Sequence, residues 1–500
     1  MVDMNELRFD PSQYEVRTVE IDGRSVTFRA FEGIQYCANP KDPIQKLNIF
    51  APEAYFHGET IHGYSMNTAP IFMPFLSGGY LPGVADVPGV GFKGWANGAF
   101  EALLHGYVAA CAGVRGRTSG EKSREFFVGT DTAYTGEATG KRVGKAPALI
   151  VDAKAAIRYL RANADLIPGN PERIVTNGIS ASGALSAMIG ATGNHPDYEP
   201  YLEEIGALPG RDDIFAANCY CPINNLENSD TAYEWLFCGV DEFHGDRMEK
   251  TDHGIVHHPF VERMTNKQIA LSHELKALFP AYLNSLGLKD ESGNALTLDA
   301  DGNGSFKAHC ERYIIASAQH ELDTHEIVDR YRKAMVEGSE VEKQPYLTIE
   351  GGKVTGIDFE CFARTITRMK KTPAFDALDL TSPENNEFGN SDTASRHFTP
   401  FSHENSEVGG GMAEPEIIKM INPTRYIRDP EADKAPHWRI RHGVYDRDTS
   451  VAIQVILATM LKNGGYDVDF EFPWGIPHSG DFEFDKLFAW IDEKAKAANQ

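Results

Sequence analysis

The stretch Asn177-Gly178-Ile179-Ser180-Ala181-Ser182-Gly183 decides the fold of this 500-residue chain. Residues 173–176 just before it read as a buried strand, and residues 184–189 just after it read as a helix. A sharp turn between a strand and a helix needs small residues, because larger neighbouring side chains would collide there. A serine on such a Gly-x-Ser-x-small turn has the placement of an exposed nucleophile. Ser182 stands where a second glycine is usual, and it is small enough to fit.

An ordinary helix start is the alternative, with Ser180 or Ser182 as the N-cap. Because Ser182 lies outside the register of the turn, Ser180 is the predicted nucleophile. A serine nucleophile also needs a base and an acid, and their place in the chain distinguishes one fold from another.

Candidates for both follow downstream. Residues 438–441 read as a strand, and Asp446 lies on the loop that follows it. Helical spacing over residues 449–462 and strand alternation over residues 468–472 come next, and His478 lies just beyond that strand. The chain order Ser, Asp, His belongs to the α/β-hydrolase fold and differs from the orders in the chymotrypsin and subtilisin folds.

These elements predict a catalytic triad of Ser180, Asp446 and His478. Taken singly, Asp446 or Asp448 could cap the following helix, and His478 could be a histidine of a surface loop. The correct order on elements of the correct type favours the triad over these separate explanations.

The composition excludes several classes of function. A net charge of −24 disfavours nucleic acid and anionic membranes as partners. No run of eighteen apolar residues could span a bilayer, and the N-terminal residues do not resemble a secretory signal, so the cytoplasm is the expected location. The seven scattered cysteines are interpreted as buried reduced thiols, and no metal site is predicted from them.

Strand and helix patterns alternate up to the Ser180 turn and return near Trp438. They predict an α/β-hydrolase core over residues 1–220 and 416–500, with a mostly parallel, doubly wound sheet. Residues 221–415, here called the insertion, carry mainly helical patterns and are expected to form a lid that shapes the substrate pocket.

Two glycine-rich stretches carry further hypotheses. Backbone N–H groups of Gly78, Gly79 and Ala181 are predicted to form an oxyanion hole, with a plain Gly-Gly turn as the alternative to the first two. Residues 299–305 have the spacing of the start of a calcium loop, but Cys310 stands at the twelfth position instead of glutamate. A polar turn is the favoured interpretation there.

With these residues placed, the chain resembles bacterial tannases, which are acylhydrolases that cleave gallate esters. The resemblance covers most of the length, including the insertion. Beyond the Ser180 turn, it rests on Gly183-Ala184-Leu185-Ser186-Ala187, Phe215-Ala216-Ala217-Asn218-Cys219-Tyr220-Cys221-Pro222-Ile223, Ala232-Tyr233-Glu234-Trp235, Asp446-Arg447-Asp448-Thr449-Ser450 and Pro477-His478-Ser479-Gly480-Asp481.

The resemblance implies that a lysine, a glutamate and an aspartate bind the three ring hydroxyls of gallate. Asp448 would be the aspartate. The lysine would be Lys370, with Lys371 as its rival, and the glutamate would be Glu384, with Glu387 as its rival. Carboxylates accept hydrogen bonds from phenolic hydroxyls, and an ammonium donates one to a phenol oxygen.

The sequence thus predicts a serine carboxylesterase acting on galloyl esters through an acyl-enzyme, without a cofactor. The alternatives are a hydroxycinnamoyl esterase, a serine peptidase and a non-catalytic binding protein on the same fold. The expected partner is a small polyphenol ester, and a monomer or small homo-oligomer is expected.

Overall fold

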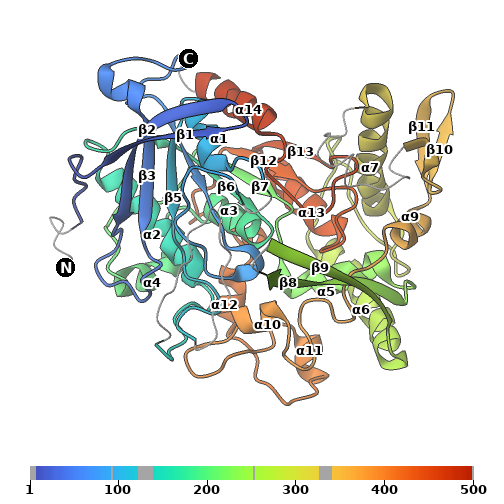
Figure 1. Cartoon of the computed structure of the whole chain (residues 1–500). Coiled ribbons are helices and arrows are strands. Elements are labelled where there is room, and N and C mark those ends of the chain that lie inside the picture. The colour runs from blue at the N-terminus through green and yellow to red at the C-terminus, as the bar shows by residue number, and fades with distance from the viewer. Residues whose placement is uncertain (1–6, 92–93, 122–138, 252–253, 326–340, 498–500) are drawn as a thin grey trace.

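The computed structural model describes residues 7–91, 94–121, 139–251, 254–325 and 341–497. A nine-stranded sheet in the order β1-β2-β3-β5-β4-β6-β7-β12-β13 forms its centre (Figure 1). The strands are β1 (Glu15–Ile21), β2 (Arg24–Ile34), β3 (Leu47–Pro52), β4 (Pro70–Pro74), β5 (Val108–Ala112), β6 (Asn170–Ile179), β7 (Ala216–Tyr220), β12 (His437–Arg441) and β13 (Asp467–Glu471).

The sheet is antiparallel at one edge and parallel over the rest. β1, β2, β3 and β5 pair antiparallel, and Asp22 and Gly23 both have positive φ in the tight turn between β1 and β2. From β5 through β4, β6, β7 and β12 to β13, every pairing is parallel. The prediction of a mostly parallel sheet is therefore confirmed.

Helices cover both faces of the sheet. Ile49 and Phe50 are neighbours on β3, yet Ile49 belongs to the large hydrophobic core and Phe50 to a smaller one that includes Phe100 of α1. Successive strand residues point to opposite faces, so each face has its own core. The helices outside the insertion are α1 (Gly98–Leu104), α2 (Ala148–Ala162), α3 (Ala181–Ala191), α4 (Glu199–Glu204), α13 (Val451–Asn463) and α14 (Phe484–Ala497).

The insertion lies between β7 and β12 in the sequence and to the right of and below the sheet in Figure 1. Its helices, followed by α12 at the boundary, are α5 (Leu226–Phe237), α6 (Asn266–Ser285), α7 (Ser305–Thr324), α9 (Phe359–Ile366), α10 (Pro383–Glu387), α11 (Pro400–Glu404) and α12 (Pro415–Met420). The sequence also predicts helix from residue 321 to 336, of which residues 326–336 lie outside the described part.

Two hairpins in the insertion were not predicted from the sequence. One is β8 (Glu242–Thr251) with β9 (Gly254–Arg263), and the other is β10 (Leu347–Glu350) with β11 (Lys353–Ile357). The insertion is therefore helical with two antiparallel ribbons rather than helical throughout.

Short 3₁₀ turns occur at η1 (Glu53–His57), η2 (Gly78–Tyr80), η3 (Pro196–Tyr198), η4 (Val341–Lys343) and η5 (Pro423–Arg425).

The topology brings the predicted catalytic residues to one edge. β4, β6, β7, β12 and β13 are consecutive parallel neighbours, so the loops at their carboxyl ends meet at the same edge of the sheet. These loops carry Gly79, Ser180, Cys221, Asp446 and His478. Among the described helices, none is long and apolar enough to cross a membrane.

Candidate active site

Ser180 lies on a strained turn between β6 and α3. Its φ of 63° and ψ of −123° are unusual for a residue with a side chain. A Cβ at Gly178 would lie 2.1 Å from the Ser182 carbonyl oxygen, and one at Gly183 would lie 2.5 Å from the Tyr220 carbonyl oxygen. The turn therefore requires glycine at both positions. Ser180 precedes α3, but its side chain makes no capping hydrogen bond, in contrast to the helix-start alternative.

The end of β7 and the loop after it hold this turn in place. The Ser180 N–H donates to the Tyr220 carbonyl at 3.0 Å, and the Ile223 N–H donates to the Ser180 carbonyl at 3.1 Å. Both backbone groups of the serine are thus occupied, which leaves its hydroxyl as the group free to act at the pocket.

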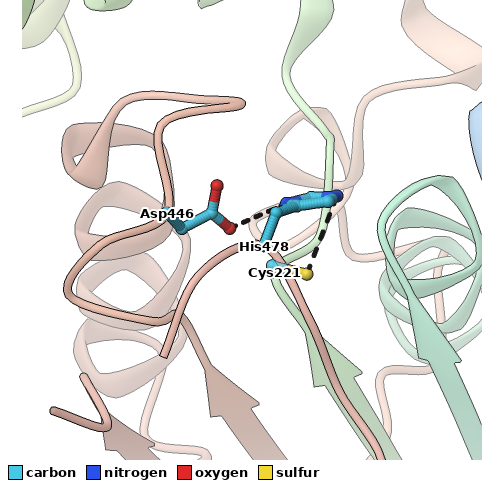
Figure 2. Close-up of side chains that lie close together, drawn as sticks. All are labelled: Cys221, Asp446 and His478. Atoms are coloured by element: carbon cyan, nitrogen blue, oxygen red, sulfur yellow. Dashed lines mark hydrogen bonds and ion pairs between the residues drawn. The ribbon is translucent and has the colours of Figure 1, made fainter. Parts of the chain in front are cut away.

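Asp446 and His478 form a hydrogen-bonded pair (Figure 2). Asp446 Oδ2 lies 2.8 Å from His478 Nδ1, and Asp446 Oδ1 accepts the Asp448 N–H at 2.9 Å. Asp446 is fully buried. Neither aspartate caps α13, because the Ser450 side chain accepts the Ala452 N–H there. Asp446 is therefore placed to orient the imidazole ring, as the acid of a triad does.

The other ring nitrogen of His478 has two neighbours. Nε2 lies 3.3 Å from Asp448 Oδ2 and 3.9 Å from Cys221 Sγ. Within the described residues, no hydrogen bond joins the Ser180 hydroxyl to His478, so the structure brings the acid and base together but leaves the serine unpaired with them. Such contacts are often long without substrate and tighten in the reacting complex.

The charges around His478 set its protonation. Burial opposes a charge on the ring, but Asp446, Cys221 and Asp448 raise the pKa of His478 well above its ordinary value of 6.5. Burial alone would raise the pKa of Asp446, whereas His478 and His442 lower it below its ordinary value. The pair thus favours an ionised carboxylate beside a readily protonated imidazole.

A cavity of about 560 Å³ opens beside Ser180. Gly79 and Ala181 line it, whereas Gly78, the third predicted oxyanion residue, is not part of its wall. The residues that the resemblance assigns to substrate binding, Lys370, Glu384 and Asp448, line the same cavity, together with Tyr80, Ile223, Phe243, Phe260, Glu262, Met369, Lys371, Pro373, Ala374, Ala377, Thr381, Ser382 and Pro383.

Of the two neighbouring lysines, Lys370 contacts the predicted binding residue Asp448. Its Nζ lies 2.5 Å from Asp448 Oδ1 and 4.0 Å from the centre of the Phe375 ring, while Lys371 is exposed. Burial opposes the charges, but Asp448 and Glu384 raise the pKa of Lys370, and Lys370 and His478 lower the pKa of Asp448 to about 2. The cavity therefore presents a charged lysine and a charged aspartate.

Tyr233 links the lysine loop to the acid loop. Its hydroxyl accepts the N–H groups of Met369 and Lys370 at 3.1 and 3.3 Å and donates to the Arg447 carbonyl at 3.0 Å. The next residue, Glu234, forms a fully buried ion pair with Arg368 at 2.5 Å. These roles could not be read from the sequence, although both residues lie in a stretch that carries the family resemblance.

Arg368 also holds the backbone of Lys370. Its Nε donates to the Lys370 carbonyl at 2.8 Å, and the Thr372 hydroxyl donates to Glu234 Oε1 at 2.7 Å. A buried ion pair with further hydrogen bonds fixes the loop backbone, so the position of Lys370 is set from α5.

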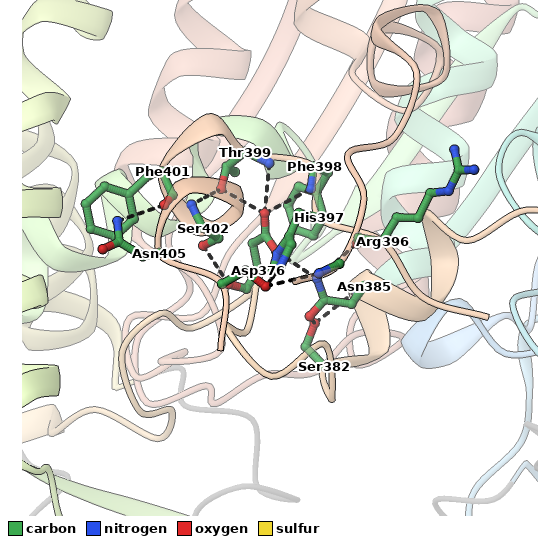
Figure 3. A network of polar contacts seen from close by, with 12 residues as sticks. Asp376, Ser382, Asn385, Arg396, His397, Phe398, Thr399, Phe401, Ser402 and Asn405 are labelled. Atoms are coloured by element: carbon green, nitrogen blue, oxygen red, sulfur yellow. Dashed lines mark hydrogen bonds and ion pairs between the residues drawn. The ribbon is translucent and has the colours of Figure 1, made fainter. Parts of the chain in front are cut away.

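A buried aspartate fixes the helix that carries Glu384. Asp376 accepts hydrogen bonds from Asn385 Nδ2 at 2.7 Å and from the N–H groups of Phe398 and Thr399 at 2.9 and 2.8 Å (Figure 3). Asn385 belongs to α10 and follows Glu384 directly. The network therefore holds α10 against the neighbouring loop and, with it, the side chain at the cavity wall.

Glu384 and its rival Glu387 have different surroundings on α10. Glu384 lines the cavity, and burial raises its pKa although Lys370 lowers it. Glu387 is fully buried away from that wall, and within the described residues neither of its carboxylate oxygens has a hydrogen-bond partner. Of the two, the structure brings Glu384 to Lys370 and Asp448.

Contacts that the sequence did not indicate support the predicted oxyanion turn. Ser182 Oγ accepts the Ser77 N–H at 2.7 Å, so this serine ties the turn to the start of α3. Arg117 Nε donates to the Gly79 carbonyl at 2.9 Å, and its backbone N–H donates to the Tyr80 carbonyl at 2.8 Å. The partners are far apart in the sequence, so no local pattern could have indicated them.

The cysteines and the suspected calcium loop are also placed. All seven cysteines are free, and Cys238 and Cys361 are only partly buried, contrary to the prediction of uniformly buried thiols. Asp299 Oδ1 accepts the N–H groups of Asp301 and Asn303 at 3.0 and 2.9 Å, an arrangement typical of the polar turn.

Comparisons with known proteins point in the same direction. A model of the BD-FAE family matches residues 138–215, which include the Ser180 turn. Esterase LipC of Mycobacterium tuberculosis is 45% identical over 58 residues, a match that spans only 12% of this chain and 14% of LipC.

Solved structures are similar over nearly the whole length. The tannase of Lactobacillus plantarum is 43% identical with a TM-score of 0.88, and the match covers 98% of this chain and 99% of that one. The tannase of Fusobacterium nucleatum is also 43% identical with a TM-score of 0.87, at the same coverage. The chain has the α/β-hydrolase fold and belongs to the tannase family of ester hydrolases.

Proposed function

We propose that this protein hydrolyses galloyl esters of tannins and related polyphenols with Ser180 as the nucleophile. One observation carries the proposal: Ser180 shares a single cavity with Lys370, Glu384 and Asp448. A nucleophile and three polar groups suited to ring hydroxyls are thus within reach of the same small molecule.

In the proposed reaction, these side chains take the roles of a serine catalytic triad. Ser180 attacks the ester carbonyl while His478 accepts its proton, and His478 then protonates the leaving alcohol. Asp446 orients the ring through Nδ1 and stabilises its charged form. Water hydrolyses the acyl-enzyme by the same steps in reverse order, and the chemistry uses no cofactor.

The oxyanion that forms on the ester needs hydrogen-bond donors. The Ala181 N–H lies at the start of α3, directly after the nucleophile, where the helix dipole adds to the attraction. Gly79 lines the same cavity and is the better placed of the two glycines to supply the second donor. In this proposal Gly78 belongs to the turn that positions Gly79 and is not itself a donor.

The ionisable side chains that line the cavity are proposed to recognise the phenolic ring of the substrate. Phenolic hydroxyls donate to the carboxylates of Asp448 and Glu384, and Lys370 donates to a phenol oxygen. The proposal is supported by solved relatives at 43% identity, one described as a tannin acyl hydrolase in complex with ethyl gallate and another with 3,4-dihydroxybenzoate.

Initial rates on four esters test the proposal: methyl gallate, methyl protocatechuate, methyl ferulate and a peptide ester, with Ser180→Ala as the control. Fast hydrolysis of methyl gallate and slow hydrolysis of methyl ferulate are expected. Equal rates on these two would favour a hydroxycinnamoyl esterase, and activity on the peptide ester alone would favour a peptidase.

A pair of neighbouring lysines tests the ring contacts. Lys370→Met should lower kcat/KM for methyl gallate, whereas Lys371→Met should leave it near the parent value, because Lys370 contacts Asp448 and Lys371 is exposed. We also propose that residues 221–415 form a lid over the cavity, that the protein acts in the cytoplasm and that it is a monomer or a small homo-oligomer.

A further inference from the structure

Two side chains with metal-binding atoms lie beside Nε2 of the His478 ring, which can itself bind a metal ion. Cys221 Sγ lies 3.9 Å and Asp448 Oδ2 3.3 Å from Nε2. Figure 2 shows Cys221 and Asp446 approaching His478 from separate loops, with Asp446 on the Nδ1 side. Ester hydrolysis assigns no role to the Cys221 thiol, so its presence beside the catalytic base calls for an explanation.

The spacing of these atoms can be compared with that of a tetrahedral zinc site. Zinc binds histidine nitrogen and carboxylate oxygen at about 2.0–2.1 Å and thiolate sulfur at about 2.3 Å. Tetrahedral angles then place nitrogen and oxygen about 3.3 Å apart, and nitrogen and sulfur about 3.6 Å apart. The first value equals the separation of His478 Nε2 and Asp448 Oδ2, and the second is within about 0.3 Å of the separation of Nε2 and Cys221 Sγ.

We propose that Cys221 Sγ, His478 Nε2 and Asp448 Oδ2 form an inhibitory site for a zinc-like divalent cation. The ion occupies the lone pair of Nε2, which therefore can no longer accept the Ser180 proton. Binding releases the thiol proton of Cys221 and leaves the serine uncharged and unactivated. The site uses the catalytic base itself as a ligand, so metal binding and hydrolysis exclude each other.

The surroundings match those of natural zinc ligands. Asp446 accepts the hydrogen bond of Nδ1, and a carboxylate on the second ring nitrogen is the usual way to orient a metal-binding histidine. A sulfur, a nitrogen and an oxygen donor together favour zinc or cadmium over magnesium or calcium.

The cation can reach the site from the substrate cavity. Asp448 lines that cavity, and the His478 side chain retains 24% of its exposure, whereas Cys221 is fully buried behind them. Cys221 has a φ of 37° directly after β7, and its thiol donates to the Ser479 carbonyl at 3.3 Å. This backbone conformation directs the sulfur toward the histidine loop.

Inhibition by zinc chloride tests the proposal. Methyl gallate hydrolysis is measured at increasing zinc for the parent, Cys221→Ala and Cys238→Ala, each relative to its own zinc-free rate. Cys238 is the matched control, because its Sγ also lies 3.3 Å from a histidine, His273 Nδ1, but outside the active site. Chelation with EDTA should restore activity, which separates metal binding from oxidation of a thiol.

The expected result is a half-inhibiting zinc concentration that rises at least about tenfold in Cys221→Ala, since even outer-shell changes cost that much affinity, and that is unchanged in Cys238→Ala. Equal sensitivity of parent and Cys221→Ala would overturn the proposal. Loss of sensitivity in Cys238→Ala would also overturn it, because the inhibiting ion would then bind at Cys238.

Cobalt provides a measurement that does not depend on the stability of the Cys221 variant. Co²⁺ is added to Cys238→Ala, in which the competing cysteine is removed, and the near-ultraviolet spectrum is recorded. A thiolate-to-cobalt charge-transfer band that rises in step with inhibition is expected, and it should be absent in the double variant that also carries Cys221→Ser. Inhibition without such a band would show that Cys221 is not a ligand and would overturn the proposal.

Discussion

Asp448 Oδ2 lies 3.3 Å from His478 Nε2, while Asp448 Oδ1 lies 2.5 Å from Lys370 Nζ. One carboxylate thus contacts both the predicted ring-binding lysine and the nitrogen that is proposed to accept the Ser180 proton. In that proposed mechanism, a ring hydroxyl that donates to Asp448 weakens the attraction of this carboxylate for the imidazole, and Nε2 becomes available to the serine. The proposal therefore couples substrate recognition and proton transfer through Asp448.

The pH dependence of hydrolysis should report this contact. His478 must be neutral to act as a base, and Asp446 and Asp448 raise its pKa above 6.5. The rate should therefore rise with pH through that raised pKa. In Asp448→Asn one of these negative charges is lost, so the rising part of the curve should move to lower pH.

The measurement is kcat/KM against pH for an activated acetate ester, because the hydroxyls of gallate ionise themselves and Asp448→Asn also removes a ring contact. Lys371→Met, which changes a nearby exposed charge, is the control. A curve that stays in place or moves to higher pH in Asp448→Asn would contradict the coupling.

The two serines of the turn should behave differently. Ser180→Ala should lower kcat by roughly 10⁴ or more, because the nucleophile is removed. Ser182→Ala should keep the nucleophile but leave the buried Ser77 N–H without its acceptor, at a cost of about 1–3 kcal/mol in stability. Steady-state kinetics and urea unfolding distinguish the two effects, and the opposite pattern would place the nucleophile at Ser182.

Two glutamates on α10 offer a matched pair. Glu384→Gln should lower kcat/KM for methyl gallate roughly tenfold to a few hundredfold, because a ring hydroxyl loses a charged acceptor. Glu387→Gln should stay near the parent rate, because Glu387 does not line the cavity that contains Ser180.

Glu387→Gln should also raise the melting temperature. Burial raises the pKa of Glu387 well above its ordinary value, and its oxygens are unpartnered among the described residues, so an amide there removes a costly buried carboxyl. A large loss of activity in Glu387→Gln with no loss in Glu384→Gln would reverse the assignment.

Arg117 should influence kcat more than KM. Its Nε–H donates a hydrogen bond to the carbonyl of Gly79, a residue of the predicted oxyanion hole. Arg117→Lys keeps the positive charge but loses this directed hydrogen bond. A displacement of the turn by about 1 Å can cost on the order of 100-fold in rate. Kinetics on methyl gallate are compared with those of Arg364→Lys, an exposed arginine on α9, and a change confined to KM would count against the positioning role.

Features encoded by short stretches of sequence were predictable. The Asp22-Gly23 turn indicated the β1–β2 hairpin, and the small residues around Ser180 indicated the turn between β6 and α3. Asp446 and His478 were identified from their order after recognisable strands. The Asp446–His478 contact then follows from topology, because parallel strands place such loops at one edge.

Features that depend on distant partners were not predictable. Ser182 and Ser77 are 105 residues apart, and Tyr233 and Arg447 are 214 apart, so neither contact leaves a local pattern. The β8–β9 hairpin was missed because Glu242–Thr251 is rich in polar residues and lacks regular apolar alternation. The choice of Lys370 over Lys371 likewise required knowing which side chain turns toward Asp448.

The short interval between Asp446 and Asp448 limits how the specificity of this enzyme can be redesigned. A change of loop length or backbone there moves the proposed catalytic acid and the proposed ring-binding acid together, because the Asp448 N–H is itself hydrogen-bonded to Asp446. Libraries aimed at new acyl groups should therefore keep this loop intact and vary other residues that line the cavity, such as Phe243, Phe260 and Thr381. The lining of the cavity can then change while the geometry of the Asp446–Asp448 loop is kept.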